Sequence, residues 1–217
     1  MNASPIRCLI TAGPTREFFD PVRFISNPSS GKMGYALAEA AKQAGWQVTL
    51  VSGPVALPKP EGVDVVPVVT GEEMYAAVKY YFPRCNVLIK SAAVCDMRPK
   101  HYLGNKVKKG ELSMTVEFEP VIDILKTIAR AKQPHQTVVG FAAETEEVEA
   151  FALKKLEAKN LDWIVANQVG GQTNAFESDQ NTVTVLGKDG QREIFGPADK
   201  AAIAGSIVTY LAKLIDA

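Results

Sequence analysis

The chain has 217 residues, 47% of them hydrophobic and 22% charged, which is enough to bury the core of one large domain, and we expect a single domain over residues 1–217. Lysine plus arginine and aspartate plus glutamate both number 24, so the overall charge favours neither nucleic acid nor an anionic membrane as a partner. The sequence shows no apolar run as long as a membrane span and no basic, apolar leader, which predicts a cytoplasmic protein.

Near-continuous runs of Val, Ile and Leu, typical of strands buried on both faces, alternate with helical patterns along the chain. The sequence predicts strands at residues 6–11, 47–52, 63–68, 87–93, 137–142 and 163–166, and helices at about 30–44, 71–82, 120–133 and 146–160. An antiparallel hairpin over 182–186 and 192–195 and a helix over 197–216, beginning at Pro197, are predicted to follow. This order indicates an α/β fold, namely a Rossmann-like, doubly wound, mainly parallel sheet with a C-terminal antiparallel hairpin and a closing helix.

Ligands of such sheets bind beyond the carboxyl ends of the strands, so the segments that follow the strands form the candidate site. After the first strand comes a connection of roughly 18 residues without evident secondary structure, and long loops of this kind are usually functional. We expect four segments to converge on one pocket: residues 12–29, 92–110, 141–145 and 167–171.

Residues 26–34, Ser-Asn-Pro-Ser-Ser-Gly-Lys-Met-Gly, run directly into an Ala-rich helical stretch. Small residues and glycines before a helix let backbone N–H groups approach an anion, and the helix dipole adds to the attraction, so a phosphorylated ligand is expected. The segment is not a P-loop, because Met33 stands where Ser or Thr is required. The second strand also lacks the acidic residue that binds a dinucleotide ribose. A flavin phosphate is harder to exclude on these residues.

Six blocks of the sequence, in order over about residues 6–210, resemble phosphopantothenoylcysteine synthetase. They are residues 10–17 (ITAGPTRE), 20–27 (DPVRFISN), 29–34 (SSGKMG), 92–96 (AAVCD), 106–109 (KVKK) and 141–145 (FAAET). In many bacteria this family is the ligase part of a bifunctional coenzyme A biosynthesis protein, fused behind a flavin-dependent decarboxylase domain. Because no flavodoxin-like domain precedes the blocks in this sequence, the resemblance implies a stand-alone synthetase without flavin.

The resemblance implies a ligation of 4'-phosphopantothenate to L-cysteine, with CTP expected as the nucleotide rather than ATP. A substrate carboxylate attacks the α-phosphorus, pyrophosphate leaves, and the cysteine amine then attacks the acyl-cytidylate and releases CMP. Neither step needs a protein nucleophile, which agrees with the presence of only two histidines. Mg²⁺ is expected through phosphate oxygens and water, and no side-chain ligand is assigned because no cluster of carboxylates stands out in the sequence. The three cysteines are odd in number and lack metal-type spacing, so reduced thiols are expected.

The resemblance also implies roles for single residues. Lys106, on a flap over about residues 100–110, would support acyl-cytidylate formation, and Asn27 would hold the pantothenate and act in the second step. Arg23 would bind substrate in the neighbouring subunit's pocket, so a homodimer with sites near its interface is expected. The other phosphopantothenate contacts would be Ala92, Ala93 and Asp96, and the nucleotide contacts would be Gly13, Ser29, Gly31, Gly34, Asp96, Lys106, Phe141 and Asn167.

Alternatives of other classes stay open on the sequence. The chain could be a flavin-dependent decarboxylase or oxidoreductase, or a nucleotide-binding module without catalysis. Single residues have structural interpretations as well: Arg23 as a salt bridge, Asn27 as a turn element and Lys106 as part of a solvated basic turn. Pro14 replaces one glycine of a pair that is common in the family, which removes a backbone donor near the expected site.

Overall fold

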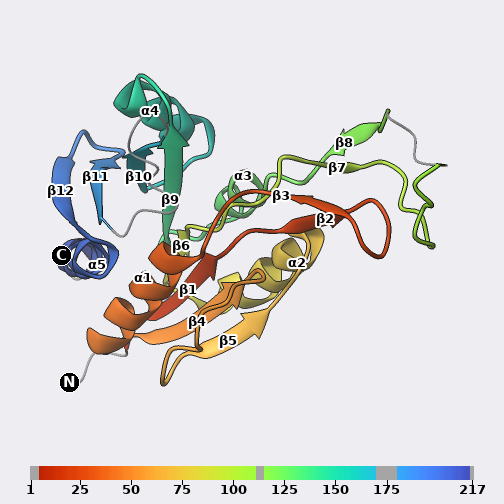
Figure 1. The fold of residues 1–217 in the computed structure, drawn as a ribbon. Helices are drawn as coiled ribbons and strands as arrows, with labels where there is room; N and C mark the ends of the chain where they lie inside the picture. Colours follow the sequence, from red (N-terminus) through yellow and green to blue (C-terminus); the bar gives the residue numbers. More distant parts are fainter. Residues whose placement is uncertain (1–4, 111–114, 170–179, 216–217) are drawn as a thin grey trace.

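The computed structural model describes residues 5–110, 115–169 and 180–215. Its main feature is an eight-stranded sheet in the order β12-β11-β10-β9-β6-β1-β4-β5 (Figure 1). Six strands run parallel, namely β1 (Arg7–Ala12), β4 (Gln47–Ser52), β5 (Asp64–Pro67), β6 (Val87–Lys90), β9 (Thr137–Glu144) and β10 (Trp163–Gln168). The antiparallel strands β11 (Gln180–Gly187) and β12 (Arg192–Asp199) extend the sheet beyond β10. The predicted fold class is confirmed.

Helices cover both faces of the sheet, which explains the continuous apolar runs in its strands. One face packs against α1 (Lys32–Gln43) and α5 (Lys200–Ile215), and the other against α2 (Gly71–Tyr81), α3 (Ile124–Ala129) and α4 (Val148–Ala158). In β1, Ile10 belongs to the first core and its neighbour Leu9 to the second, and both are fully buried. A strand covered on both sides buries consecutive side chains, which favours apolar residues on both of its faces. Among the described helices, none has both the length and the apolar character that crossing a bilayer requires.

The order of the strands places a ligand crevice next to β1. Along the chain, β1 is followed by its neighbour β4 and then β5 on one side, whereas β6, β9 and β10 follow on the other side. After β1 the chain adds strands on one side of it, and from β6 onwards it adds them on the other side, so the switch point lies between β1 and β6. In open α/β sheets, ligands bind at this switch point, outside the carboxyl ends of the strands.

Two short antiparallel ribbons project from the body of the sheet and lie together in Figure 1. One pairs β2 (Arg16–Phe18) with β3 (Phe24–Ser26), and the other pairs β7 (Met97–Pro99) with β8 (Phe118–Pro120). The expectation of an irregular connection over residues 12–29 is therefore wrong. Strands of three residues are too short to show an alternating pattern in a single sequence.

Several predicted boundaries are also wrong. Helix α3 is shorter than predicted, because β8 continues to Pro120 and the Asp123 side chain caps the helix by accepting a hydrogen bond from the Lys126 N–H at 3.0 Å. Pro197 does not begin the closing helix but lies within β12. Helix α5 begins at Lys200, where the Asp199 carboxylate accepts a hydrogen bond from the Ala202 N–H at 2.7 Å. Residues 170, 171 and 216, which also belong to predicted segments, lie outside the described residues.

Candidate functional site

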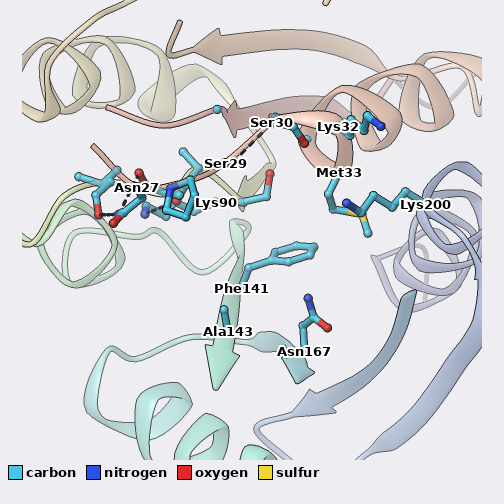
Figure 2. Close-up of a pocket in the computed structure, with 18 of the residues that line it drawn as sticks. Asn27, Ser29, Ser30, Lys32, Met33, Lys90, Phe141, Ala143, Asn167 and Lys200 are labelled. Atoms are coloured by element: carbon cyan, nitrogen blue, oxygen red, sulfur yellow. Dashed lines mark hydrogen bonds between the residues drawn. The ribbon is translucent and has the colours of Figure 1, made fainter. Parts of the chain in front are cut away.

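A cavity of about 340 Å³ lies at the carboxyl edge of the sheet, at the switch point (Figure 2). Residues from all four predicted segments line it, so the predicted convergence is confirmed. The lining consists of Gly13, residues 27–34, residues 90–94, residues 141–143, Asn167, Asn181, Val183 and Lys200.

The described part of the cavity lining is basic although the chain as a whole has no net charge. Its described lining includes Lys32, Lys90 and Lys200 and contains no aspartate or glutamate. Because acidic residues are as frequent as basic ones in this chain, their separation at this site creates a local field that attracts anions. The composition of the lining therefore matches a ligand with several negative charges.

The start of α1 brings backbone donors to this cavity. Gly31, the N-cap residue, has a φ of 77°, and within the described residues no side chain caps this helix and its first turn contains no acidic residue. The Ser29 hydroxyl accepts a weak hydrogen bond from the Gly31 N–H at 3.4 Å. A helix start without an acidic cap leaves its positive dipole end to an anionic ligand.

Close packing at Gly34 fixes the start of α1 against the sheet. A Cβ atom at this position would lie 2.5 Å from Ala12 Cβ and 2.8 Å from Ser91 Oγ, so no larger residue fits without movement. This contact holds the first turn of α1 directly over the carboxyl ends of β1 and β6. Gly34 also lines the cavity, so a movement of α1 at this point would change the shape of the site.

Asn27 is tied to the loop that follows β6. Its Nδ2 group donates hydrogen bonds to the carbonyl oxygens of Ala93, at 3.3 Å, and Val94, at 3.1 Å. The same loop is held to the β1 side by a hydrogen bond from the Ala93 N–H to the Gly13 carbonyl at 2.9 Å. Because both Nδ2 hydrogens of Asn27 are engaged in these bonds, its side chain can offer a ligand the Oδ1 acceptor.

Lys90 is a site residue that the sequence analysis missed. Its ammonium donates a hydrogen bond to the Ala92 carbonyl at 3.0 Å, next to the carbonyls that Asn27 binds. Burial and then the positive charge of Lys159 lower the pKa of Lys90 to about 8, while Asp123 and Asp96 oppose this shift. The only signal in the sequence was a lysine at the end of a strand that is otherwise buried.

Phe141 and Asn167 lie on the part of the cavity that β9 and β10 form (Figure 2). Phe141 is half-buried, and the Asn167 Oδ1 atom is buried without a hydrogen-bond partner among the described residues. A buried acceptor without a partner carries a desolvation cost that a ligand donor can relieve. An aromatic ring beside such an acceptor suits a planar heterocycle with an amino group.

Three predicted site residues lie outside the cavity lining: Arg23, Asp96 and Lys106. Arg23 forms an ion pair with Asp20 at 2.7 Å and donates to the Val107 carbonyl at 3.2 Å, so its structural interpretation is correct for the single chain. Asp96 and Lys106 are exposed. The proposed ligand contacts of Arg23, Asp96 and Lys106 remain predictions. The same holds for the predicted site residues that line the cavity.

Over residues 5–110, 115–169 and 180–215, no group of three or more His, Cys, Asp or Glu side chains could hold a metal ion.

Residues 4–215 match the family model described as the DNA/pantothenate metabolism flavoprotein C-terminal domain. The chain belongs to this family. It is 46% identical over 207 residues to the coenzyme A biosynthesis bifunctional protein CoaBC of Bacillus subtilis, covering 95% of this chain and 51% of that protein. The CoaBC protein of Escherichia coli is 44% identical over 206 residues, covering 94% of this chain and 50% of that protein. The chain thus spans about half the length of these curated relatives.

Solved structures agree with the family assignment. The crystal structure of the C-terminal domain of a CoaBC protein has a TM-score of 0.83 and 42% sequence identity, and the match covers 97% of this chain and 96% of that domain. The Cab2 mutant H337A, solved in complex with phosphopantothenate-cysteine, has a TM-score of 0.82 at 17% identity, which shows a shared fold. The expected resemblance to one half of the bifunctional coenzyme A biosynthesis proteins is confirmed.

Proposed function

We propose that this chain is a cytoplasmic phosphopantothenate-cysteine ligase that uses CTP to join 4'-phosphopantothenate to L-cysteine. The observation that carries the proposal is the cavity at the switch point, whose described lining combines the uncapped start of α1 with three lysines and no acidic residue. Such a site suits two phosphorylated substrates at once. The names of the relatives, which place them in coenzyme A biosynthesis, support the same reaction.

In the first step, a carboxylate oxygen of phosphopantothenate attacks the α-phosphorus of CTP, a P–O bond forms, and pyrophosphate leaves with the electron pair of the broken P–O bond. The protein must hold two anions together and stabilise the charge on the leaving group. The nucleotide phosphates would be surrounded by Gly13, Ser29, Gly31 and Gly34. Lys106 would close over them from the flap, where one well-placed donor is worth about 3 kcal/mol of transition-state stabilisation.

In the second step, the cysteine amine attacks the acyl carbon and forms a C–N bond. CMP leaves with the electron pair of the broken C–O bond, and the amine proton passes to solvent. Asn27 would act in this step. In support, its Nδ2 hydrogen bonds fix it to the loop that contains Ala92 and Ala93. Its Oδ1 would accept a hydrogen bond from the attacking amine. Orientation of this kind lowers the barrier without a protein nucleophile.

Mg²⁺ would accompany the nucleotide. The described cavity lining contains no carboxylate, so these residues fit a hard ion held by phosphate oxygens and water rather than by the protein. When bound, such an ion neutralises part of the phosphate charge. The lysines of the lining and the N–H groups of α1 would then orient the phosphates around it.

We further propose that the ligase is a homodimer that forms through the two ribbons. Large apolar side chains are exposed on the ribbons and on the loop between β7 and β8, which is unusual for a surface that faces only solvent. Arg23 lies at the turn of the first ribbon, and we propose that it reaches the cavity of the second subunit. The exposed residues are Val22, Phe24, Met97, Tyr102, Leu103, Val116 and Phe118.

The direct test is pyrophosphate release from CTP and Mg²⁺ with phosphopantothenate, with and without cysteine, and with ATP in place of CTP. The proposal expects release with CTP, and CMP plus an amide product once cysteine is added. Thermal stabilisation by CTP without turnover would instead identify a binding module, and a yellow protein with flavin absorbance would favour flavin chemistry.

Sedimentation of the wild type and a Phe24→Glu variant tests the dimer, which the charged variant should dissociate.

A further inference from the structure

Lys200 is a charged residue at the cavity that the family resemblance did not indicate. It is only 8% exposed, it is the first residue of α5, and it lines the cavity together with Met33 of α1. Figure 2 shows its side chain extending into the cavity beside Met33, on the side opposite Asn27 and with Phe141 between them. Lys200 therefore lies on the side of the cavity that is proposed to bind the nucleotide.

The topology explains why Lys200 reaches the ligand edge. Strand β11 is antiparallel to β10 and β12 is antiparallel to β11, so β12 runs parallel to β10 and ends at the same edge of the sheet. Helix α5 then packs beside α1 and is anchored by Ile203, Ile207 and Leu211, each no more than 1% exposed. The backbone of Lys200 is thus held in place by the core.

The two helix starts at this edge have different surroundings. The Asp199 carboxylate already caps α5 by accepting a hydrogen bond from the Ala202 N–H. Helix α1 has no side-chain cap within the described residues, and its first turn contains no acidic residue. An anion at this point would therefore be held by the N–H groups of α1, with the Lys200 ammonium as an additional donor.

We propose that Lys200 binds a phosphate group of the nucleotide and holds it against the N–H groups at the start of α1. This inference rests on the proposed function, which it extends by a residue that binds the nucleotide. A lysine ammonium offers three donors and a full charge, and lysine is a common phosphate ligand in proteins. The neighbouring Phe141 and Asn167 suit the base of the same nucleotide, whereas Asn27, a proposed phosphopantothenate contact, lies on the opposite side of the cavity (Figure 2).

The experiment is calorimetric titration of the full chain with CTP and Mg²⁺, and separately with phosphopantothenate, for the wild type and three variants. Lys200→Gln keeps the length of the side chain but removes its charge, and Lys200→Arg keeps the charge. Lys213→Gln removes a charge from the exposed last turn of the same helix and is the matched control. Thermal denaturation without ligand checks that each variant is folded.

The proposal expects Lys200→Gln to raise the Kd for CTP at least about tenfold, the factor that a lost charge-assisted hydrogen bond produces. Lys200→Arg should recover part of the affinity, and the Kd for phosphopantothenate should change less than about twofold. Unchanged CTP binding in Lys200→Gln, or an equal loss for both substrates, would overturn the proposal. If the wild type releases no pyrophosphate while its CTP binding still depends on Lys200, the ligase function fails and this inference stands.

Discussion

Asp20 and Arg23 form an ion pair at 2.7 Å in which the carboxylate is only 1% exposed. The same carboxylate accepts a hydrogen bond from the Val107 N–H at 3.4 Å, and Arg23 donates to the Val107 carbonyl at 3.2 Å. Val107 is the neighbour of Lys106, so the turn of the β2–β3 ribbon holds the flap by its backbone. The position of the proposed catalytic lysine therefore depends on a residue pair far away in the sequence.

We predict that Asp20→Asn loosens this flap. The amide cannot form the ion pair, and Arg23 would lose its orientation toward Val107, so hydrogen exchange over residues 100–110 should accelerate and pyrophosphate release should slow several-fold. The matched control is Glu117→Gln, which breaks an exposed ion pair with Lys100 at 3.0 Å and should change little. Equal exchange in the wild type and Asp20→Asn would show that the pair does not hold the flap.

The same pair has a predictable pH dependence. Burial by itself would raise the pKa of Asp20, but hydrogen bonds from the N–H groups of Val22, Arg23 and Val107 and the charge of Arg23 lower it below 3.8. Since the pKa is lower in the folded state, this stabilisation is complete above the unfolded value and is lost as the pH falls through the folded one. The difference in melting temperature between the wild type and Asp20→Asn should thus be constant above about pH 5 and shrink below pH 4.

Gly34→Ala should damage both stability and nucleotide binding. Its Cβ would lie 2.5 Å from Ala12 Cβ, and relief of this contact requires α1 to move away from the sheet, at a cost of about 1–3 kcal/mol. The control is Gly205→Ala within α5, where a Cβ meets nothing within 4 Å and should stabilise by up to about 1 kcal/mol. Denaturant titration and CTP binding measure the two effects, and a Gly34→Ala protein as stable as the wild type would contradict the assigned packing.

Lys90→Met should stabilise the protein at neutral pH and lose this advantage in alkali. The pKa of Lys90 is lowered to about 8 from 10.5, so below pH 8 the folded protein carries a charge that burial disfavours. Between pH 8 and 10.5 the folded state has lost this proton while the unfolded state retains it, so the stability of the wild type rises toward that of the variant. The difference in the free energy of unfolding between the variant and the wild type is on the order of 3 kcal/mol at most. The hydrogen bond from Lys90 to the Ala92 carbonyl, which the variant loses, reduces this difference. A gap that does not change between pH 7 and 10 would contradict this assignment.

The sequence predicted the sheet and the converging loops because these follow from local patterns. The run over residues 47–52 coincides with β4, and the Ser-Gly segment before α1 does line the cavity. The two ribbons were missed because each of their strands has only three residues, and β7 in addition pairs with a strand that lies far along the chain. The closing helix was predicted to start at Pro197 because proline favours a first helical turn, whereas pairing with β11 extends the strand to Asp199.

The site was predicted less completely than the fold. Lys90 was counted as part of a buried strand, and Lys200 was counted within a helix that was given the wrong start. Neither position can be placed at a cavity without the register of the sheet. The proposed roles of Arg23 and Lys106 raise a different difficulty. The role of Arg23 depends on a second subunit and that of Lys106 on closure of the flap, and local sequence patterns predict neither the subunit contact nor the closure.

Substitutions of Lys106 and Asn27 should block different chemical steps. Lys106→Gln should reduce acyl-cytidylate formation about a hundredfold, because it removes the charge proposed to stabilise the leaving pyrophosphate. Asn27→Asp should instead let the intermediate accumulate, since an aspartate cannot donate to the Ala93 and Val94 carbonyls and its charge disfavours correct placement of the acyl group. Quenched-flow analysis of acyl-cytidylate and CMP distinguishes the two blocks, with Lys108→Gln, an exposed neighbour, as the control for flap charge. Normal turnover in both variants would refute the division of roles between the flap and the loop after β6.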